Sequence, residues 1–251
     1  EEVLSHDILE GIYLKAGFVS DVELTDGYPS NISSWLSRLH RWIRGDWQNI
    51  NYLFDKNISS INRYKLFDNL RRSLSCLFSL ITILLGIYLK IYNYKYASII
   101  CLIGFLSITF NSLFAATMSI ISSGLFTLSR KFYTKVIPEA FEYIFQSIFL
   151  TIMLISQTIT SVDAIIRALY RKFISKKNLL EWVTAAQADN QKLNSIFILK
   201  KFFWPELIGL LILIFCPTGG LKLLGLLFSF IIPLVLISNS EGKKKSVNLP
   251  Y

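Results

Sequence analysis

The side chains best suited to chemistry gather in one short stretch, residues 37–48, which reads Ser-Arg-Leu-His-Arg-Trp-Ile-Arg-Gly-Asp-Trp-Gln. This stretch holds three Arg, one His, one Asp, one Gln and two Trp residues. Arg guanidinium groups bind phosphate through forked hydrogen bonds, and a Trp ring offers a sugar a flat apolar face and an N–H group. Residues 37–48 therefore combine phosphate-binding with sugar-stacking side chains, just ahead of a strongly apolar part of the chain.

Among the basic side chains of this stretch, Arg41 is the first candidate for a phosphate ligand, with Arg38 and Arg44 as helpers. The competing interpretation is that one or more of these Arg residues, Arg44 above all, faces lipid headgroups. His40 either donates a hydrogen bond to a phosphate or packs as a neutral ring.

The aromatic and remaining polar side chains also have two interpretations each. Trp42 is the first candidate for stacking on a sugar ring, and Trp47 is a further candidate for binding the substrate. The competing interpretation is an anchor at a membrane interface, which is strongest for Trp47 and Trp35. Asp46 and Gln48 either bind hydroxyl groups of a sugar acceptor or are polar residues at the end of a helix.

A carboxylate near the start of the chain is the candidate for proton transfer. Ser5 begins a short amphipathic helix with Asp7 and Glu10 in its first turns. A positioned carboxylate can act as a general base, but from spacing alone Asp7 is better interpreted as an ordinary helix-start residue that the helix dipole favours. Glu10 either holds His6 or a substrate hydroxyl, or it is a solvated helix residue.

Local patterns predict how these side chains are positioned. Residues 18–24 mix apolar and polar side chains in a loosely strand-like way, and residues 26–29 form a turn. A helix beginning at about Pro29 carries apolar side chains at helical spacing through residues 37–48, and Gly45 is expected to break or kink it.

The composition indicates a membrane protein. The chain has 251 residues, is 53% hydrophobic and carries a net charge of +9, and its mean hydropathy is +0.47. Lys and Arg lie beside apolar segments, which favours loops facing anionic lipid over a nucleic-acid partner. The three Cys residues lie within or at the end of apolar runs without metal-ligand or disulfide spacing, so they are expected to be buried small apolar residues.

About four transmembrane helices are expected. Residues 73–89 and about 97–128 are uncharged, and residues 204–240 read as an apolar hairpin. Residues 143–162 either span the bilayer or, as the preferred interpretation, lie along the interface or pack against other spans. Most Lys and Arg residues near these spans fall on the side of the N-terminal part, which the positive-inside rule places in the cytoplasm.

The motifs resemble those of membrane-embedded polysaccharide synthases. The catalytic domains of those enzymes, which have the GT-A fold, end with a Glu-Asp element whose Asp is the base, followed by a Gln-x-x-Arg-Trp element. Here His6-Asp7 stands in the place of the first element and residues 38–42 (Arg-Leu-His-Arg-Trp) in the place of the second. Arg38 replaces the Gln.

A closer resemblance is to the cyclic β-1,2-glucan synthases. It is carried by residues 5–11 (Ser-His-Asp-x-Leu-Glu-Gly), residues 19–23 (Val-Ser-Asp-Val-Glu) and residues 40–48. A later segment, residues 163–167 and 178–188, is similar to the post-membrane segment of the same family. The resemblance covers essentially the whole chain.

This resemblance implies an inverting glycosyltransferase of the bacterial cytoplasmic membrane that transfers glucose from UDP-glucose to the 2-hydroxyl of a growing cyclic β-1,2-glucan. It implies that Asp7 is the base and that Arg41 and Trp42 bind the diphosphate and the acceptor sugar. The chain begins without Met and is expected to be a fragment, inactive alone and without a metal site. The donor-binding half, which places Mg²⁺ or Mn²⁺ on the diphosphate, is expected upstream and a phosphorylase-like domain downstream.

The expected fold class is a mostly α, polytopic membrane protein that begins with the C-terminal remnant of a GT-A α/β domain. One alternative is a cellulose-type β-glucan synthase, and another is a non-catalytic transporter or scaffold, which would place functional charges inside its spans. The expected division is residues 1–62 for the catalytic remnant, 63–130 for two transmembrane helices, 131–203 for cytoplasmic and interfacial helices, 204–240 for a transmembrane hairpin and 241–251 for a basic tail.

Overall fold

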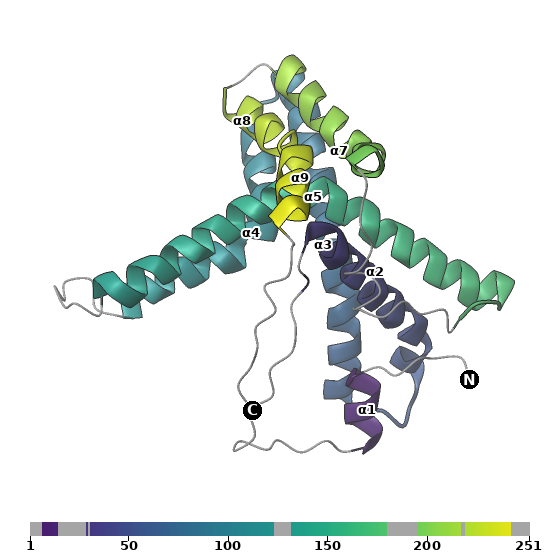
Figure 1. Cartoon of the computed structure of the whole chain (residues 1–251). Helices are drawn as coiled ribbons and strands as arrows, with labels where there is room; N and C mark the ends of the chain where they lie inside the picture. Colours follow the sequence, from purple (N-terminus) through teal and green to yellow (C-terminus); the bar gives the residue numbers. More distant parts are fainter. Residues whose placement is uncertain are drawn as a thin grey trace. The chain divides into compact units, whose positions relative to one another are not determined.

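The computed structural model describes residues 7–14, 29, 31–122, 132–179, 195–216 and 219–241, and this part of the chain contains helices and no strand (Figure 1). The helices are α1 (Asp7–Leu14), α2 (Ile32–Gln48), η1 (Asn49–Phe54), α3 (Ser60–Ile91), α4 (Ala97–Ser122), η2 (Phe132–Val136), α5 (Ile137–Tyr170), η3 (Arg171–Ser175), α7 (Ser195–Phe215), α8 (Gly219–Phe228) and α9 (Ile231–Glu241). His6, the strand-like residues 18–24 and residues 180–188 lie outside the described residues.

Helix α2 begins at a side-chain cap. Asn31 precedes it in an extended conformation, and the Asn31 Oδ1 accepts a hydrogen bond of 2.9 Å from the backbone N–H of Ser34. This bond satisfies one of the N–H groups that a helix start leaves without a partner. The expected break at Gly45 is not present, because α2 continues through this residue to Gln48. Residues 37–48 therefore lie on one uninterrupted helix.

The chain forms two compact units. The first comprises residues 1–74, 159–198 and 233–251. In this unit, α1 packs through the buried Leu9 against Ile58 and Leu66. A second core of the same unit joins α2 to α3 and α5, and its buried centre is Ile43 with Ala164 and Ile165.

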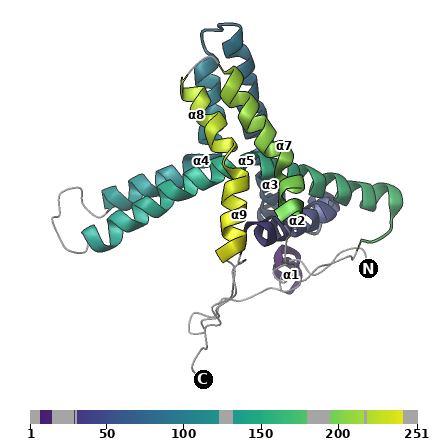
Figure 2. The same ribbon diagram turned by 45° about the horizontal axis from the view of Figure 1, so that its top comes forward.

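The second unit comprises residues 75–158 and 199–232. Its core draws side chains from α3, α4, α5, α7 and α8, and Ile83, Leu154 and Phe228 lie at its buried centre. Helix α4 runs antiparallel beside the first part of α5 (Figure 2), and the Ser119 hydroxyl donates a hydrogen bond of 3.1 Å to Glu139 between them. The three cysteines, Cys76, Cys101 and Cys216, are free and buried, which confirms the interpretation of these residues.

Four helices are long and apolar enough to cross a membrane: Ser60–Ile91, Ala97–Ser122, Phe132–Ser175 and Gly219–Ser238. Their length and composition indicate a multi-pass membrane protein. The number agrees with the expected one, but the third candidate contains residues 143–162, which were expected to lie along the interface or to pack against other spans. Helix α7, the first arm of the expected hairpin, carries Lys200, Lys201 and Glu206, and these charges make it a poorer candidate for a span.

Two glycines allow α3 and α4 to approach each other closely. A Cβ atom on Gly86 would lie 2.8 Å from the backbone N of Cys101, and a Cβ on Gly104 would lie 2.9 Å from the backbone N of Ile83. Distances this short to backbone atoms require the helices to move apart. Small residues at such contacts are typical of helix pairs in membranes.

We therefore expect Gly86→Ala to lower the stability of the intact protein by about 1–3 kcal/mol, because the added methyl group forces α3 away from α4. The measurement is thermal unfolding in detergent. Gly220→Ala is the matched control, because a Cβ on Gly220 meets nothing within 4 Å. Equal melting temperatures for the two variants would contradict the close packing of α3 on α4.

Candidate functional site

The apolar face of α2 packs on α3 and α5. Ile43 is 4% exposed and contacts a cluster that includes Ala164 and Ile165, with Leu39 and Trp47 of α2 packed alongside. Full burial of an Ile side chain contributes roughly 1.5–3 kcal/mol. This contact therefore fixes which face of α2 turns toward α3 and α5.

The opposite face of α2 carries the predicted phosphate ligands. Successive residues of an α-helix are about 100° apart around its axis, so Arg38 and Arg41 lie opposite Ile43. Trp42 is 53% exposed, and the Arg38 guanidinium carbon lies 4.6 Å from the centroid of its ring. This cation–π contact places a positive charge against the indole, of which about half the surface stays exposed.

Electrostatics on this face favour an anion. The pKa of Arg41 is lowered, first by partial burial and then by the neighbouring positive charge of Arg38. Two guanidinium groups one helical turn apart repel each other, and a bound phosphate would relieve this repulsion. Arg38, Arg41 and Arg44 all have further interactions in the folded chain, so a phosphate would join or displace existing contacts.

His40 lies on the packed side of α2 and pairs with α5. Its Nε2 is 3.0 Å from Oδ2 of Asp163, and the other oxygen of this carboxylate accepts a bond of 2.8 Å from Arg167. Burial lowers the pKa of His40 below its ordinary value of 6.5, and Arg44 and Arg167 lower it further, although Asp163 acts to raise it. The ring is therefore neutral at physiological pH and donates from Nε2 to Asp163. This geometry agrees with the packing interpretation of His40.

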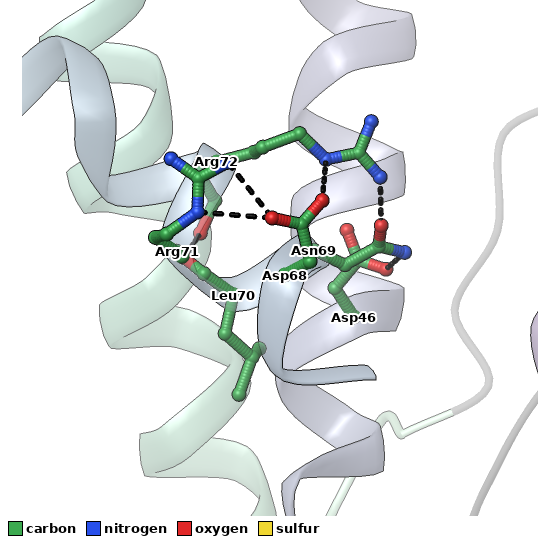
Figure 3. A network of polar contacts seen from close by, with 7 residues as sticks. Asp46, Asp68, Asn69, Leu70, Arg71 and Arg72 are labelled. Carbon is green, nitrogen blue, oxygen red and sulfur yellow. Dashed lines mark hydrogen bonds and ion pairs between the residues drawn. The ribbon is translucent and has the colours of Figure 1, made fainter. Parts of the chain in front are cut away.

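The C-terminal half of α2 is bound to α3 by two further hydrogen bonds. Asn69 Nδ2 donates to Asp46 Oδ1 over 2.8 Å, and Trp47 Nε1 donates to Ser73 Oγ over 2.9 Å. Figure 3 shows Asp46 beside Asn69. In the same view, Asp68 forms ion pairs with Arg71 and Arg72 one turn away on its own helix.

The C-terminal end of α2 contacts η3 and a residue that follows it, Leu179. Gln48 is 2% exposed, and its Nε2 donates a bond of 2.9 Å to the carbonyl of Leu179. The Lys172 ammonium donates to the backbone carbonyl of Gln48. Asn49 is 1% exposed, and among the described residues neither polar atom of its side chain has a hydrogen-bond partner. The polar atoms of Asp46 and Gln48 thus hold the helix in place, and a role in binding an acceptor stays a prediction.

The predicted base, Asp7, is exposed at the first position of α1, with Glu10 exposed one turn later. Helix α1 is held from its other face by Leu9, and Tyr13 donates a long hydrogen bond of 3.4 Å to Asp55. Within the described part of the chain, no hydrogen bond or ion pair joins Asp7 to α2. The structure thus leaves the carboxylate accessible without bringing it into contact with Arg41 or Trp42.

The described residues do not supply a metal centre. Among them, no group of three or more His, Cys, Asp and Glu side chains is placed to hold a metal ion. The isolated carboxylates of α1 and α2 do not fit a cation that prefers several oxygen ligands. No step of a reaction can therefore be assigned here to a metal bound by these residues.

Sequence reasoning did not find the partners of α2. Asp163, Asn69, Ser73 and Lys172 bind this helix, although they lie 23 to 124 positions away along the chain. One feature of the sequence indicates such a partner. Asp163 is the first charged residue after the uncharged residues 143–162, and a helix at a membrane surface is expected to contact a polar side chain at the end of such a run.

The lowered pKa of His40 predicts a pH dependence of stability. The folded state binds fewer protons on His40 than the unfolded state, so the ring contributes stability above its unfolded-state pKa of 6.5. This contribution decreases as the pH falls below that value and is lost below the folded-state pKa. Between about pH 8 and about pH 5, we expect the melting temperature of the intact protein in detergent to fall more for wild type than for His40→Asn. Parallel pH curves would show that His40 is not buried as a neutral ring.

Comparison with known proteins adds one finding. No family model matches the chain. Over 240 residues the chain is 35% identical to the cyclic beta-(1,2)-glucan synthase NdvB of Rhizobium meliloti strain 1021, and the match covers 91% of the chain and 8% of that protein. The chain is therefore similar over nearly all of its length to one segment of a cyclic β-(1,2)-glucan synthase, which confirms the resemblance predicted from its motifs.

Proposed function

We propose that the chain is a segment of an inverting membrane glycosyltransferase that transfers glucose from UDP-glucose to the 2-hydroxyl of a growing cyclic β-1,2-glucan. The observation that carries this proposal is the orientation of α2. Its apolar face packs around Ile43, so Arg38 and Arg41 point away from that core. The similarity to a cyclic β-(1,2)-glucan synthase supports a β-1,2-glucan as the product.

The role of Arg41 is to stabilise the leaving group. Transfer breaks the bond between the anomeric carbon and the diphosphate, and the electron pair of that bond leaves on UDP. A guanidinium group stabilises the resulting negative charge on the diphosphate through two parallel hydrogen bonds. Arg38 lies close enough to lower the pKa of Arg41, so both positive charges act on the same region.

Asp7 is the proposed general base. The acceptor hydroxyl attacks the anomeric carbon, and its proton moves to the Asp7 carboxylate as the new glycosidic bond forms. The exposure of Asp7 at the start of α1 leaves the carboxylate accessible to an acceptor. In the same proposal, the exposed Trp42 indole stacks on a glucose ring of the acceptor and thereby orients the attacking hydroxyl.

The intact enzyme requires parts that this chain does not supply. We propose a donor-binding half with Mg²⁺ or Mn²⁺ upstream and a phosphorylase-like domain downstream, so that the chain alone is inactive. The N-terminal part is placed on the cytoplasmic side of the bacterial inner membrane, where UDP-glucose is available. The basic residues beside the spans support this orientation.

The first prediction for this function concerns Asp7. In membranes holding the intact protein and labelled UDP-glucose with Mg²⁺ or Mn²⁺, Asp7→Asn is expected to lower incorporation about 10²- to 10⁴-fold, because the amide cannot accept the proton. The linkage of the product is read at the same time. Asp68→Asn, whose carboxylate pairs only with neighbouring Arg residues on α3 in the described chain, is the matched control and is expected to stay near wild type.

Each outcome of this experiment is informative. Label in another linkage keeps the transferase but points to a related β-glucan synthase. Undiminished incorporation by Asp7→Asn removes Asp7 as the base. No incorporation by the wild-type protein would favour a non-catalytic membrane protein.

The second prediction concerns Arg41. Loss of a charged hydrogen bond costs about 1.5–3 kcal/mol, so Arg41→Ala is expected to lower kcat/KM for UDP-glucose by about 10- to 150-fold. Arg41→Lys should recover only part of this loss, because an ammonium group cannot bind bidentately. The control is Arg71→Ala, which removes an exposed Arg that is paired locally with Asp68. Equal activity of Arg41→Ala and Arg71→Ala would contradict the proposed phosphate contact.

A further inference from the structure

We propose that Asp163 is a positioning residue of the transferase: through His40, its carboxylate holds α2 in the rotation that presents Arg41 and Trp42 to the substrates. This inference rests on the proposed function. It concerns a side chain on α5 that does not touch a substrate and acts through the helix that does.

The contact is specific in its geometry. The two oxygens of Asp163 have different partners, since Oδ2 accepts from His40 Nε2 at 3.0 Å and Oδ1 accepts from Arg167 Nε at 2.8 Å. Arg167 lies one turn further along the same helix, so it fixes the orientation of the carboxylate independently of α2. A carboxylate held in this way constrains both the direction and the length of its hydrogen bond with His40.

Because of the position of His40, this hydrogen bond limits the rotation of α2 about its own axis. His40 lies on the packed side of α2, about 60° from Ile43 around the axis, whereas Arg41 lies opposite Ile43. Because the two residues are adjacent in the sequence, any rotation that moves His40 away from Asp163 swings Arg41 by the same angle. Apolar packing of Ile43 against Ala164 and Ile165 tolerates small rotations, but a hydrogen bond of 3.0 Å does not.

The two partners of α2 on α5 and α3 lie at the ends of uncharged runs of the sequence. Asp163 follows the uncharged residues 143–162 of α5, and Ser73, which accepts from Trp47, is the first residue of the uncharged run 73–89 of α3. Helix α2 is therefore bound to α5 just after one uncharged run and to α3 at the first residue of the other.

The same bond changes the role predicted for His40. Its Nε2–H is donated to Asp163, so this group is not available to a phosphate. The charged groups around the ring are Asp163 and Arg167 from α5 and Arg44 from α2. His40 thus links Asp163 to the substrate-binding face and is itself a positioning residue.

The test is a double-mutant cycle in the intact protein, assayed in membranes with labelled UDP-glucose. Asp163→Asn and His40→Asn are each expected to lower kcat by about 10- to 100-fold, since a displacement of about 1 Å at a reacting group has an effect of this size. The double variant is expected to be no worse than the poorer single variant, because both changes break one contact. Asp163→Glu, which keeps the carboxylate, is expected to recover part of the activity.

The control is Asp68→Asn, which removes a carboxylate that is paired with Arg residues within α3 and makes no described contact with α2. The amount of each variant in the membrane and its proteolysis pattern are measured in parallel. Equal activity of Asp163→Asn and Asp68→Asn, multiplicative effects in the double variant, or losses of activity that merely follow losses of folded protein would each overturn the inference. Absence of transfer by the wild type would instead overturn the proposed function.

Discussion

The burial of Ile43 between α3 and α5 is the contact on which the candidate site depends. Helix α2 is too rich in charge to enter a bilayer, and its only large apolar surface is the stripe that includes Leu39, Ile43 and Trp47. Once that stripe is packed, the direction of every other side chain on the helix follows from its helical spacing. The hydrogen bonds to Asp163 and Ser73 then select one rotation from the few that the apolar contact allows.

This arrangement divides the polar side chains of α2 into two groups with different tasks. His40, Asp46 and Gln48 use their polar atoms on neighbouring helices and turns, whereas Arg38 and Arg41 lie opposite the packed stripe. Charge stabilisation in catalysis depends on groups that are already oriented before the reaction. A helix held by several hydrogen bonds along one side is therefore a suitable carrier for phosphate-binding guanidinium groups.

The polar character of α5 has a structural explanation. The Thr151 hydroxyl donates a hydrogen bond of 2.8 Å to the carbonyl of Ser147, one turn earlier on the same helix. The Cys76 thiol of α3 donates to Gln157 Oε1 over 3.2 Å. These side chains are buried. The Thr151 hydroxyl and Gln157 Oε1 therefore have partners in the helix backbone or on α3 rather than in water, whereas Gln157 Nε2 has no hydrogen-bond partner among the described residues. Composition favoured a helix at the interface or packed against other spans, because the number of polar groups does not show where their hydrogen bonds are made.

The sequence by itself determined the helical character of residues 37–48, the buried state of the cysteines and the family resemblance, because periodicity, local composition and motif order are properties of short segments. It did not determine that α2 passes unbroken through Gly45, that residues 143–162 form part of a candidate span, or that His40 meets Asp163. That pairing joins residues 123 positions apart. It exists only because the apolar faces of α2 and α5 pack together, and no local pattern specifies which distant helix fills that position.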